Sequence, residues 1–390
     1  MPPFDPAAAT AAYLATLSPA AHARATAYTQ GGHWLLLWSW LVSVVAALVI
    51  IRSGVLARTE AGLQRRKPRP ILVSLLISGL YILLDAVLEL PWEVYAHWWR
   101  EKAYGLTSQA FSGWLTEQTI GLAISVVVTS LFLAVIYAVI RRSPRWWWAW
   151  AGGVAAVFIL AALVLAPIYI EPIFNHYTPA PPGPMRDAVV ALAKKADVPS
   201  DKIFIFDGSR QSNRYTANVS GLFGSARVAM SDVMFKKGAD LAEVRGVVGH
   251  EMGHYRQGPL ILAGPFALLA IVAFGLTHLL FAPAARLLGA RVAGIGDPAG
   301  LPVLMAVIAT LGLVGTPVTS TLTRWIEADA DSFSLRVANE PDGLAKALVQ
   351  TIEYRASSPS NLEEFLFYDH PSVEHRVRKA MDWKAAHPPG

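Results

Sequence analysis

Two histidines flank a glutamate in the sequence His250-Glu251-Met252-Gly253-His254. On an α-helix, positions four residues apart lie on one face, so both imidazoles could bind the same metal ion. The glutamate between them would stand beside that ion, where it could act as a base. A pentapeptide this short also occurs by chance on buried helices, so a metal site needs further ligands.

A third ligand is expected because a zinc hydrolase combines three protein ligands with an open position for water. The third histidine of the metzincins is missing, since Gln257 and Leu260 stand where that pattern needs glycine and histidine. Further along the chain, Glu327, Asp329 and Asp331 supply three acids in five residues. Glu327 and Asp331 share a helical face, so we expect Glu327 to ligate zinc and Asp331 to orient a ligating histidine. The alternative is a charged helix collar at a membrane surface.

The residues before His250 predict the helix that would carry the motif. Asp240 is an N-cap residue, and Glu243 completes a capping box three residues later. Apolar residues then recur with helical spacing as far as Tyr255, and Gly258-Pro259 predicts a break. In the same segment we expect another helix and two strands: Asp187–Lys195, Lys202–Phe206 and Ala226–Met230.

The composition indicates a membrane protein. Hydrophobic residues make up 54% and charged residues 16% of the 390 residues, against about 25% charged in an ordinary globular domain. Cysteine is absent, which excludes disulfides and thiolate ligands, and we do not interpret the net charge of +5 as nucleic-acid binding. Six stretches are long and apolar enough to span a bilayer: Trp34–Ile51, Ile71–Leu90, Gln118–Ile140, Trp146–Ile170, Leu260–Phe281 and Pro298–Thr323.

These stretches divide the chain into five parts. Residues 1–33 lack the basic start of a signal peptide and are expected to form a short amphipathic or extended lead-in. Residues 34–170 hold four spans, 171–258 a polar segment with the HExxH motif, 259–323 two more spans and 324–390 a charged helical segment. Because two spans separate the polar segments, both lie on one side and could build one site. Trp146–Trp148 is expected to form an interfacial belt.

In these motifs and their order, the chain resembles the type I CAAX prenyl proteases and their bacterial relatives. In that family a Glu-x-x-Ala-Asp motif follows HExxH after two spans, as Glu327–Asp331 does here. Other similar stretches occur in the same order from about residue 70 to 380: Leu90–Tyr95, Glu101–Gly105, Tyr169–Asn175, Tyr177–Pro179, His370-Pro371 and Glu374–Arg376.

The resemblance implies a mainly α, multi-pass membrane fold. About six transmembrane helices would form a chamber, capped by a gluzincin-type metalloprotease domain with a small β-sheet. Asp85 and Glu89, within the second span, would line this chamber. The resemblance also implies one Zn²⁺ per chain and the lipid bilayer as surroundings, with location in a bacterial inner membrane.

Further site residues follow from the resemblance. Zinc would activate water, Glu251 would take its proton, and His370 would stabilise the oxyanion. Arg376 would support His370 or bind a substrate carboxylate. The family's substrate-binding asparagine is replaced by Thr216, and Asn218 could act instead because a shift of two keeps the same face of a strand.

The sequence therefore predicts a zinc metalloendopeptidase that cleaves a peptide or protein substrate, including a lipidated one, with membrane-protein quality control as another role. The alternatives are an inactive membrane chaperone of this fold, a transporter and a site-2-type protease. The positive-inside rule places the catalytic segments outside the cytoplasm, whereas the resemblance implies a cytosolic site, so both orientations stay open. The basic side holds Arg52, Arg58, Arg65, Arg66, Lys67, Arg69, Arg141, Arg142, Arg145, Arg286 and Arg291.

Overall fold

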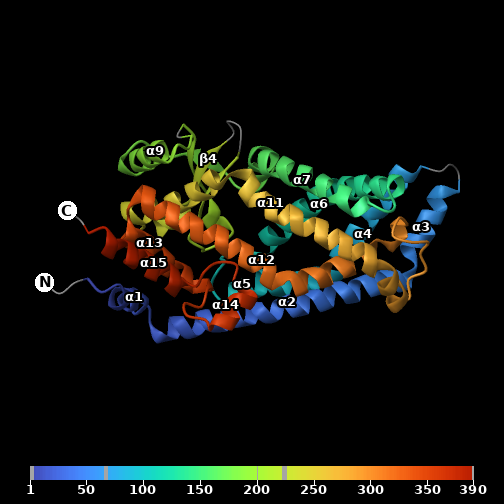
Figure 1. Ribbon diagram of the computed structural model, residues 1–390, viewed down its shortest axis with the longest axis horizontal. Coiled ribbons are helices and arrows are strands. Elements are labelled where there is room, and N and C mark those ends of the chain that lie inside the picture. Colours follow the sequence, from blue (N-terminus) through green and yellow to red (C-terminus); the bar gives the residue numbers. More distant parts are fainter. Residues whose placement is uncertain (1–3, 66–68, 200, 222–225, 389–390) are drawn as a thin grey trace.

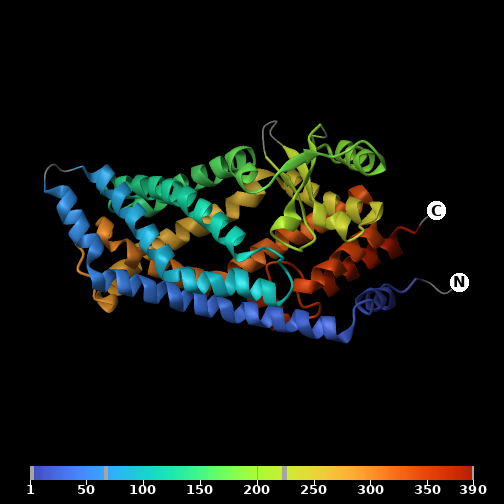
Figure 2. The ribbon, with the colours of Figure 1, turned by 180° about the vertical axis from the view of Figure 1, so that it is seen from behind.

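The computed structural model describes residues 4–65, 69–199, 201–221 and 226–388. Arg66 and Lys67, two of the residues on the basic side of the spans, lie outside these residues. Long helices extend along the molecule, while the sheet, the C-terminal helices and both termini gather at one end (Figure 1; Figure 2 shows the reverse).

Six helical stretches in the described residues are long and apolar enough to cross a membrane, and they overlap the six predicted stretches. The mainly α, multi-pass fold class is therefore confirmed. The stretches are α2 (Pro19–Ser53); α4 (Pro70–Glu93) with η1 (Val94–Trp99) and α5 (Arg100–Ala103); α6 (Phe111–Arg142); α7 (Trp147–Leu165) with η2 (Ala166–Ile170) and α8 (Glu171–Phe174); the later part of α11 (Leu241–Leu288); and α12 (Leu301–Ala338) with the preceding η4 (Pro298–Gly300).

The N-terminal lead-in is helical. Asp5 caps α1 (Pro6–Leu14), and α2 begins at Pro19 after the Ser18 cap. α1 packs against α15 (Val373–Ala386), and the Tyr13 hydroxyl donates to Asp342 at 2.7 Å. The start of the chain is thereby attached to its C-terminal segment.

A four-stranded sheet follows the fourth span, with the order β1-β2-β4-β3. β2 (Ile203–Phe206) and β4 (Arg227–Ser231) are the two predicted strands and pair in parallel. β1 (Tyr177–Pro179) and β3 (Ala217–Ser220) pair antiparallel to them, one at each edge. These edge strands were not predicted because they are short and lack an alternating apolar pattern.

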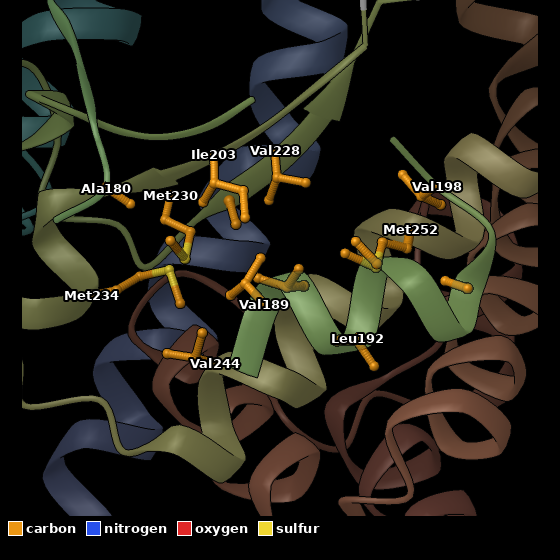
Figure 3. Close-up of a cluster of buried hydrophobic side chains, with 14 of the residues drawn as sticks. Ala180, Val189, Leu192, Val198, Ile203, Val228, Met230, Met234, Val244 and Met252 are labelled. Atoms are coloured by element: carbon orange, nitrogen blue, oxygen red, sulfur yellow. The ribbon is translucent and has the colours of Figure 1, made fainter. Parts of the chain in front are cut away.

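The sheet and α9 (Pro184–Ala196) enclose one face of α11. Figure 3 shows Val244 and Met252 of α11 among Val189 of α9 and Val228 and Met230 of β4, all buried. Met252 lies between Glu251 and Gly253 in sequence and has no exposed surface. This apolar face holds α11 in place, and the two histidines lie on a different face of the helix.

A second face of α11 is made of glycines and packs closely on α12 and, at Gly246, on α13 (Pro341–Gln350). Gly246, Gly249 and Gly253 lie one turn apart along this face. A Cβ atom at Gly253 would lie 2.9 Å from the Ala330 Cα, and one at Gly249 would lie 2.9 Å from the Ser334 Oγ. The Ser334 hydroxyl also donates to the Gly246 carbonyl at 2.7 Å. The absence of side chains here lets the two helix backbones approach each other.

α11 starts at the predicted capping box, in which Asp240 and Glu243 each accept from the other's backbone N–H. At Gly258 the backbone has φ 73° and ψ 170°, so the helix kinks where a break was predicted. Only glycine adopts this φ at little cost. The kink separates the part of α11 that carries the HExxH motif from its membrane part.

Two other sequence expectations concern single side chains. Trp147 is fully buried and donates to His278 Nδ1 at 3.0 Å, so it belongs to the core and not to the predicted belt. Trp146 is 53% exposed, as a belt residue would be.

The remaining elements are α3 (Val55–Gln64), η3 (Gly208–Arg210), α10 (Asp232–Lys236), η5 (Thr351–Tyr354) and α14 (Asn361–Phe367).

Candidate active site

The structure brings the three expected zinc ligands together between α11 and α12. Glu327 Oε2 lies 3.1 Å from His250 Nε2, and Glu327 Oε1 lies 3.4 Å from His254 Nε2. One ligand atom from each residue falls within 4.8 Å of the others. Ligand atoms about 2 Å from a tetrahedral zinc ion lie about 3.3 Å from one another, so this spacing fits the ion.

Behind His250 lies a buried ion pair that fixes the imidazole. Asp331 Oδ1 is 2.8 Å from His250 Nδ1, which directs Nε2 towards Glu327. The Arg376 guanidinium in turn donates to both Asp331 oxygens, at 2.8 and 2.7 Å. Arg376 is 7% exposed, so its position differs from the substrate-binding one that we expected. It instead holds the carboxylate that orients His250.

The second histidine has a partner that the sequence reading missed. His254 Nδ1 lies 3.2 Å from Gln257 Oε1, one turn further along α11. The Gln257 amide donates to the Ile326 carbonyl at 2.7 Å and to Asp329 at 3.0 Å. Gln257 thus connects His254 to α12. A polar residue three positions after a ligating histidine was the available signal.

The electrostatics of the site favour positive charge. Although burial disfavours an imidazolium, the neighbouring Asp331 and Glu327 carboxylates raise the pKa of His250 to about 9. Glu327 Oε2 is buried and has no hydrogen-bond partner of acceptable geometry among the described residues. A divalent cation would supply the positive charge and satisfy this oxygen, so the residues fit a metal.

Glu251 follows His250 on α11 but is not part of the ligand group. Burial raises the pKa of its carboxyl, and the neighbouring histidines oppose this rise. A raised pKa is typical of a carboxylate that accepts and returns protons near neutral pH.

His370 reaches the same site from the segment between α14 and α15. Its Nε2 lies 3.2 Å from Glu327 Oε2, and its Nδ1 lies 2.8 Å from Asp369 Oδ1. Burial lowers the pKa of His370 below its usual value, and the hydrogen bond to Asp369 only partly opposes this shift. Asp369 was not among our candidates, although it directly precedes the His-Pro pair.

Asn218 lies on the edge strand β3, opposite Ala229 of β4. Its buried Oδ1 has no hydrogen-bond partner among the described residues. Beyond it, Val219 and Ser220 border a mostly apolar cavity of about 430 Å³ that His254 also lines. Pro167, from the η2 stretch after α7, lies on another side of this cavity. An apolar space therefore adjoins the metal group at the membrane boundary.

The two carboxylates of the second span border a separate cavity of about 440 Å³ between α4 and α6. Asp85 and Glu89 both line it, together with Gln118 of α6. Glu89 also accepts from Ser43 of α2 at 2.6 Å. These acids therefore border a space partly lined by polar side chains, and their place in a larger chamber stays a prediction.

Comparison with known families agrees with this geometry. The profile described as "CAAX prenyl protease N-terminal, five membrane helices" matches residues 7–176, and the profile of peptidase family M48 matches residues 180–384. The chain belongs to peptidase family M48. It is thus a membrane metalloprotease of the CAAX prenyl protease type. Within the described part of residues 7–176 we find four candidate spans, where the profile describes five.

Individual relatives are distant but cover much of the chain. The uncharacterized metalloprotease YhfN of Bacillus subtilis is 25% identical over 85% of this chain and 79% of its own length. A CAAX prenyl protease 1 homolog of Arabidopsis thaliana is 23% identical over 88% of this chain and 78% of its own. The CAAX prenyl protease 1 of Saccharomyces cerevisiae is 24% identical over 58% of this chain and 47% of its own.

A solved structure shows the same fold. The crystal structure of S. mikatae Ste24p matches with a TM-score of 0.76, covering 94% of this chain and 90% of that one at 21% identity. This similarity extends over the spans and the catalytic segments together.

Proposed function

We propose that this protein is a zinc-dependent endopeptidase that cleaves peptide bonds at the membrane boundary. The observation that supports this most is the convergence of His250, His254 and Glu327, with Glu251 beside them on α11. Zinc held by these three side chains would supply a Lewis acid for the scissile carbonyl and for the attacking water.

The chain's own residues would carry the proton transfers. Glu251 takes a proton from water and returns it to the leaving amine. His370 donates from Nε2 to the oxyanion that develops on the substrate. Asp369 accepts a hydrogen bond from the Nδ1–H group of His370, so a neutral imidazole would carry no proton on Nε2. Donation from Nε2 therefore requires the imidazolium form of His370, which the Asp369 carboxylate stabilises.

Asp331, Arg376 and Gln257 act as positioning residues. They hold the Nδ1 sides of His250 and His254 by hydrogen bonds, so that both Nε2 atoms face Glu327. Such partners fix the imidazole orientation and increase metal affinity in zinc enzymes.

For the substrate, we propose an extended peptide that runs along β3. The Asn218 Oδ1, which has no partner among the described residues, would accept a hydrogen bond from it, and the apolar cavity beside His254 would hold a bulky apolar group. Several relatives are named as prenyl proteases, which makes a lipidated peptide one candidate for this cavity. We place the protein in a bacterial inner membrane, where cleavage of membrane proteins in quality control is a second role.

Glu251→Gln tests the proposed function. The amide keeps the size of the side chain but cannot act as a base, so we expect a folded protein with full zinc content and peptidase activity lowered at least about 100-fold. Peptide turnover by the variant at close to the wild-type rate would contradict the mechanism. If the purified wild-type protein lacks stoichiometric zinc and peptidase activity, the alternative of an inactive chaperone or transporter-like protein is favoured. Proteomic comparison of cells carrying either form would identify substrates.

A further inference from the structure

A groove lies between α6 and α7, at the ends of these helices that are remote from the metal group. The cavity has a volume of about 550 Å³. Most of the atoms that line it are apolar, and Arg142 is its charged residue. The lining includes Val135, Val139 and Arg142 of α6 and Trp150, Gly153 and Val157 of α7. We call this feature the α6–α7 groove.

The groove runs from the membrane boundary towards the bilayer centre. Arg142 and Trp150 lie at the helix ends, whereas Val135 and Phe158 lie about two turns further in, which is about 10 Å along a helix. Phe158 meets Phe132 edge-to-face at a ring distance of 5.0 Å near this inner end. Side chains along the groove are accessible, with Trp150 65% and Val157 64% exposed. Its length and polarity gradient suit one end of a phospholipid acyl chain.

The stretch of chain that lines the groove carries charged side chains of one sign. Residues 118–170 contain no aspartate or glutamate, and their only basic residues are Arg141, Arg142 and Arg145. Arg141 donates to Ser74 of α4, and the Arg145 guanidinium lies 5.7 Å from the Trp146 ring centre. α7 also starts here, and a helix start adds partial positive charge. The outer end of the groove is therefore complementary to an anion.

We propose that the α6–α7 groove binds one anionic glycerophospholipid, with an acyl chain along the apolar lining and the phosphate at Arg142. A glycerophospholipid suits both ends of the groove at once, because it joins a phosphate to a long apolar chain. The site lies on the basic side of the spans, where anionic lipids accumulate if that side is cytoplasmic.

Native mass spectrometry of the full-length protein in mild detergent tests the headgroup. Phosphatidylglycerol and phosphatidylcholine with identical acyl chains are titrated separately, and we expect about one phosphatidylglycerol to bind per chain in preference to phosphatidylcholine. Arg142→Gln should weaken phosphatidylglycerol binding about fivefold, the effect of one basic residue at a membrane surface. The control Arg286→Gln removes an exposed arginine from the last turn of α11, away from the groove, and should bind like wild type. Equal binding of both lipids, or wild-type binding by Arg142→Gln, would overturn the proposal.

Gly153→Leu tests the acyl-chain position. A Cβ at Gly153 meets no atom within 4 Å, so a leucine fits the fold and fills the groove. We expect this variant to lose phosphatidylglycerol binding and keep its thermal stability, while Gly312→Leu, also without a neighbour within 4 Å, keeps both. Unchanged binding by Gly153→Leu would overturn the proposal. Competition by millimolar inorganic phosphate would also overturn it, because it would indicate a simple anion site. A wild-type dimer that Gly153→Leu abolishes would overturn it too, because a second copy of the chain would then be the occupant.

Discussion

At the scale of single residues, the three neighbouring acids of α12 have three different sets of contacts. Glu327 faces both histidines, Asp331 lies behind His250, and Asp329 accepts from Gln257. The difference follows from the 100° step of a helix, which separates Asp329 from the face that Glu327 and Asp331 share. Three carboxylates on one helix thus make different contacts because they lie at different positions.

This arrangement predicts how metal content responds to substitution. Glu327→Ala should lose stoichiometric zinc, because only two protein ligands would remain. Asp329→Ala should keep stoichiometric zinc, since it removes only one bond to Gln257. Elemental analysis of the purified variants checks both expectations. If Asp329→Ala loses zinc while Glu327→Ala keeps it, our assignment of the third ligand is wrong.

A pH profile tests the proposed role of His370. Asp369 raises the pKa of His370 against the effect of burial, so Asp369→Asn should lower that pKa. If the imidazolium is the active form, its population at a given pH falls and the alkaline limb of kcat/KM moves to lower pH. A profile that keeps its alkaline limb in place would remove His370 from the mechanism, whatever the change in overall rate.

At the scale of elements, the site depends on how closely two helices approach. α11 carries two ligands and α12 carries the third, and the glycine face of α11 sets the distance between their axes. The opposite face is held by Val244, Val248 and Met252, which pack in the core with α9 and the sheet. Helix packing and metal binding are therefore coupled.

Gly253→Ala tests this coupling. The new methyl group would lie 2.9 Å from the Ala330 Cα, so α12 must move, at a cost of about 1–3 kcal/mol for overpacking. We expect a lower thermal midpoint and weaker zinc retention against a chelator. Gly264→Ala on the same helix is the matched control, because its methyl group meets no atom within 4 Å. It should be neutral or slightly stabilising. Similar zinc retention by both variants would argue against control by the glycine face.

At the scale of the whole molecule, the spans place the sheet, the C-terminal helices and both termini at one end (Figure 1). The connections at the other end carry most of the basic loop residues, including Arg58, Arg145 and Arg291. By the positive-inside rule, this basic end is expected in the cytoplasm and the catalytic end outside it.

Reporter fusions at the C-terminus check this orientation. A periplasmic alkaline phosphatase reporter should be active there, whereas a fluorescent protein that folds in the cytoplasm should be dark. The opposite pattern would support the cytosolic site that the family resemblance implies. A fusion after Arg145 serves as the control, because it lies on the other side of the membrane in either case.

The sequence alone was sufficient for features that depend on local pattern. The six apolar stretches, the Asp240–Glu243 capping box, the break at Gly258 and the strands β2 and β4 all follow from composition and periodicity. The HExxH spacing identified candidate ligands for the same reason, because a helix has a regular period.

Other features were decided only by tertiary structure. The position of Arg376 behind Asp331, the bonds that Gln257 donates to Ile326 and Asp329, and the contact of Gly253 with Ala330 all join residues from separate elements. A sequence pattern records which face of an element is apolar, but it does not record how closely two elements approach. That distance results from side-chain volumes on both helices at once, and here it determines whether two histidines and a glutamate can share one ion.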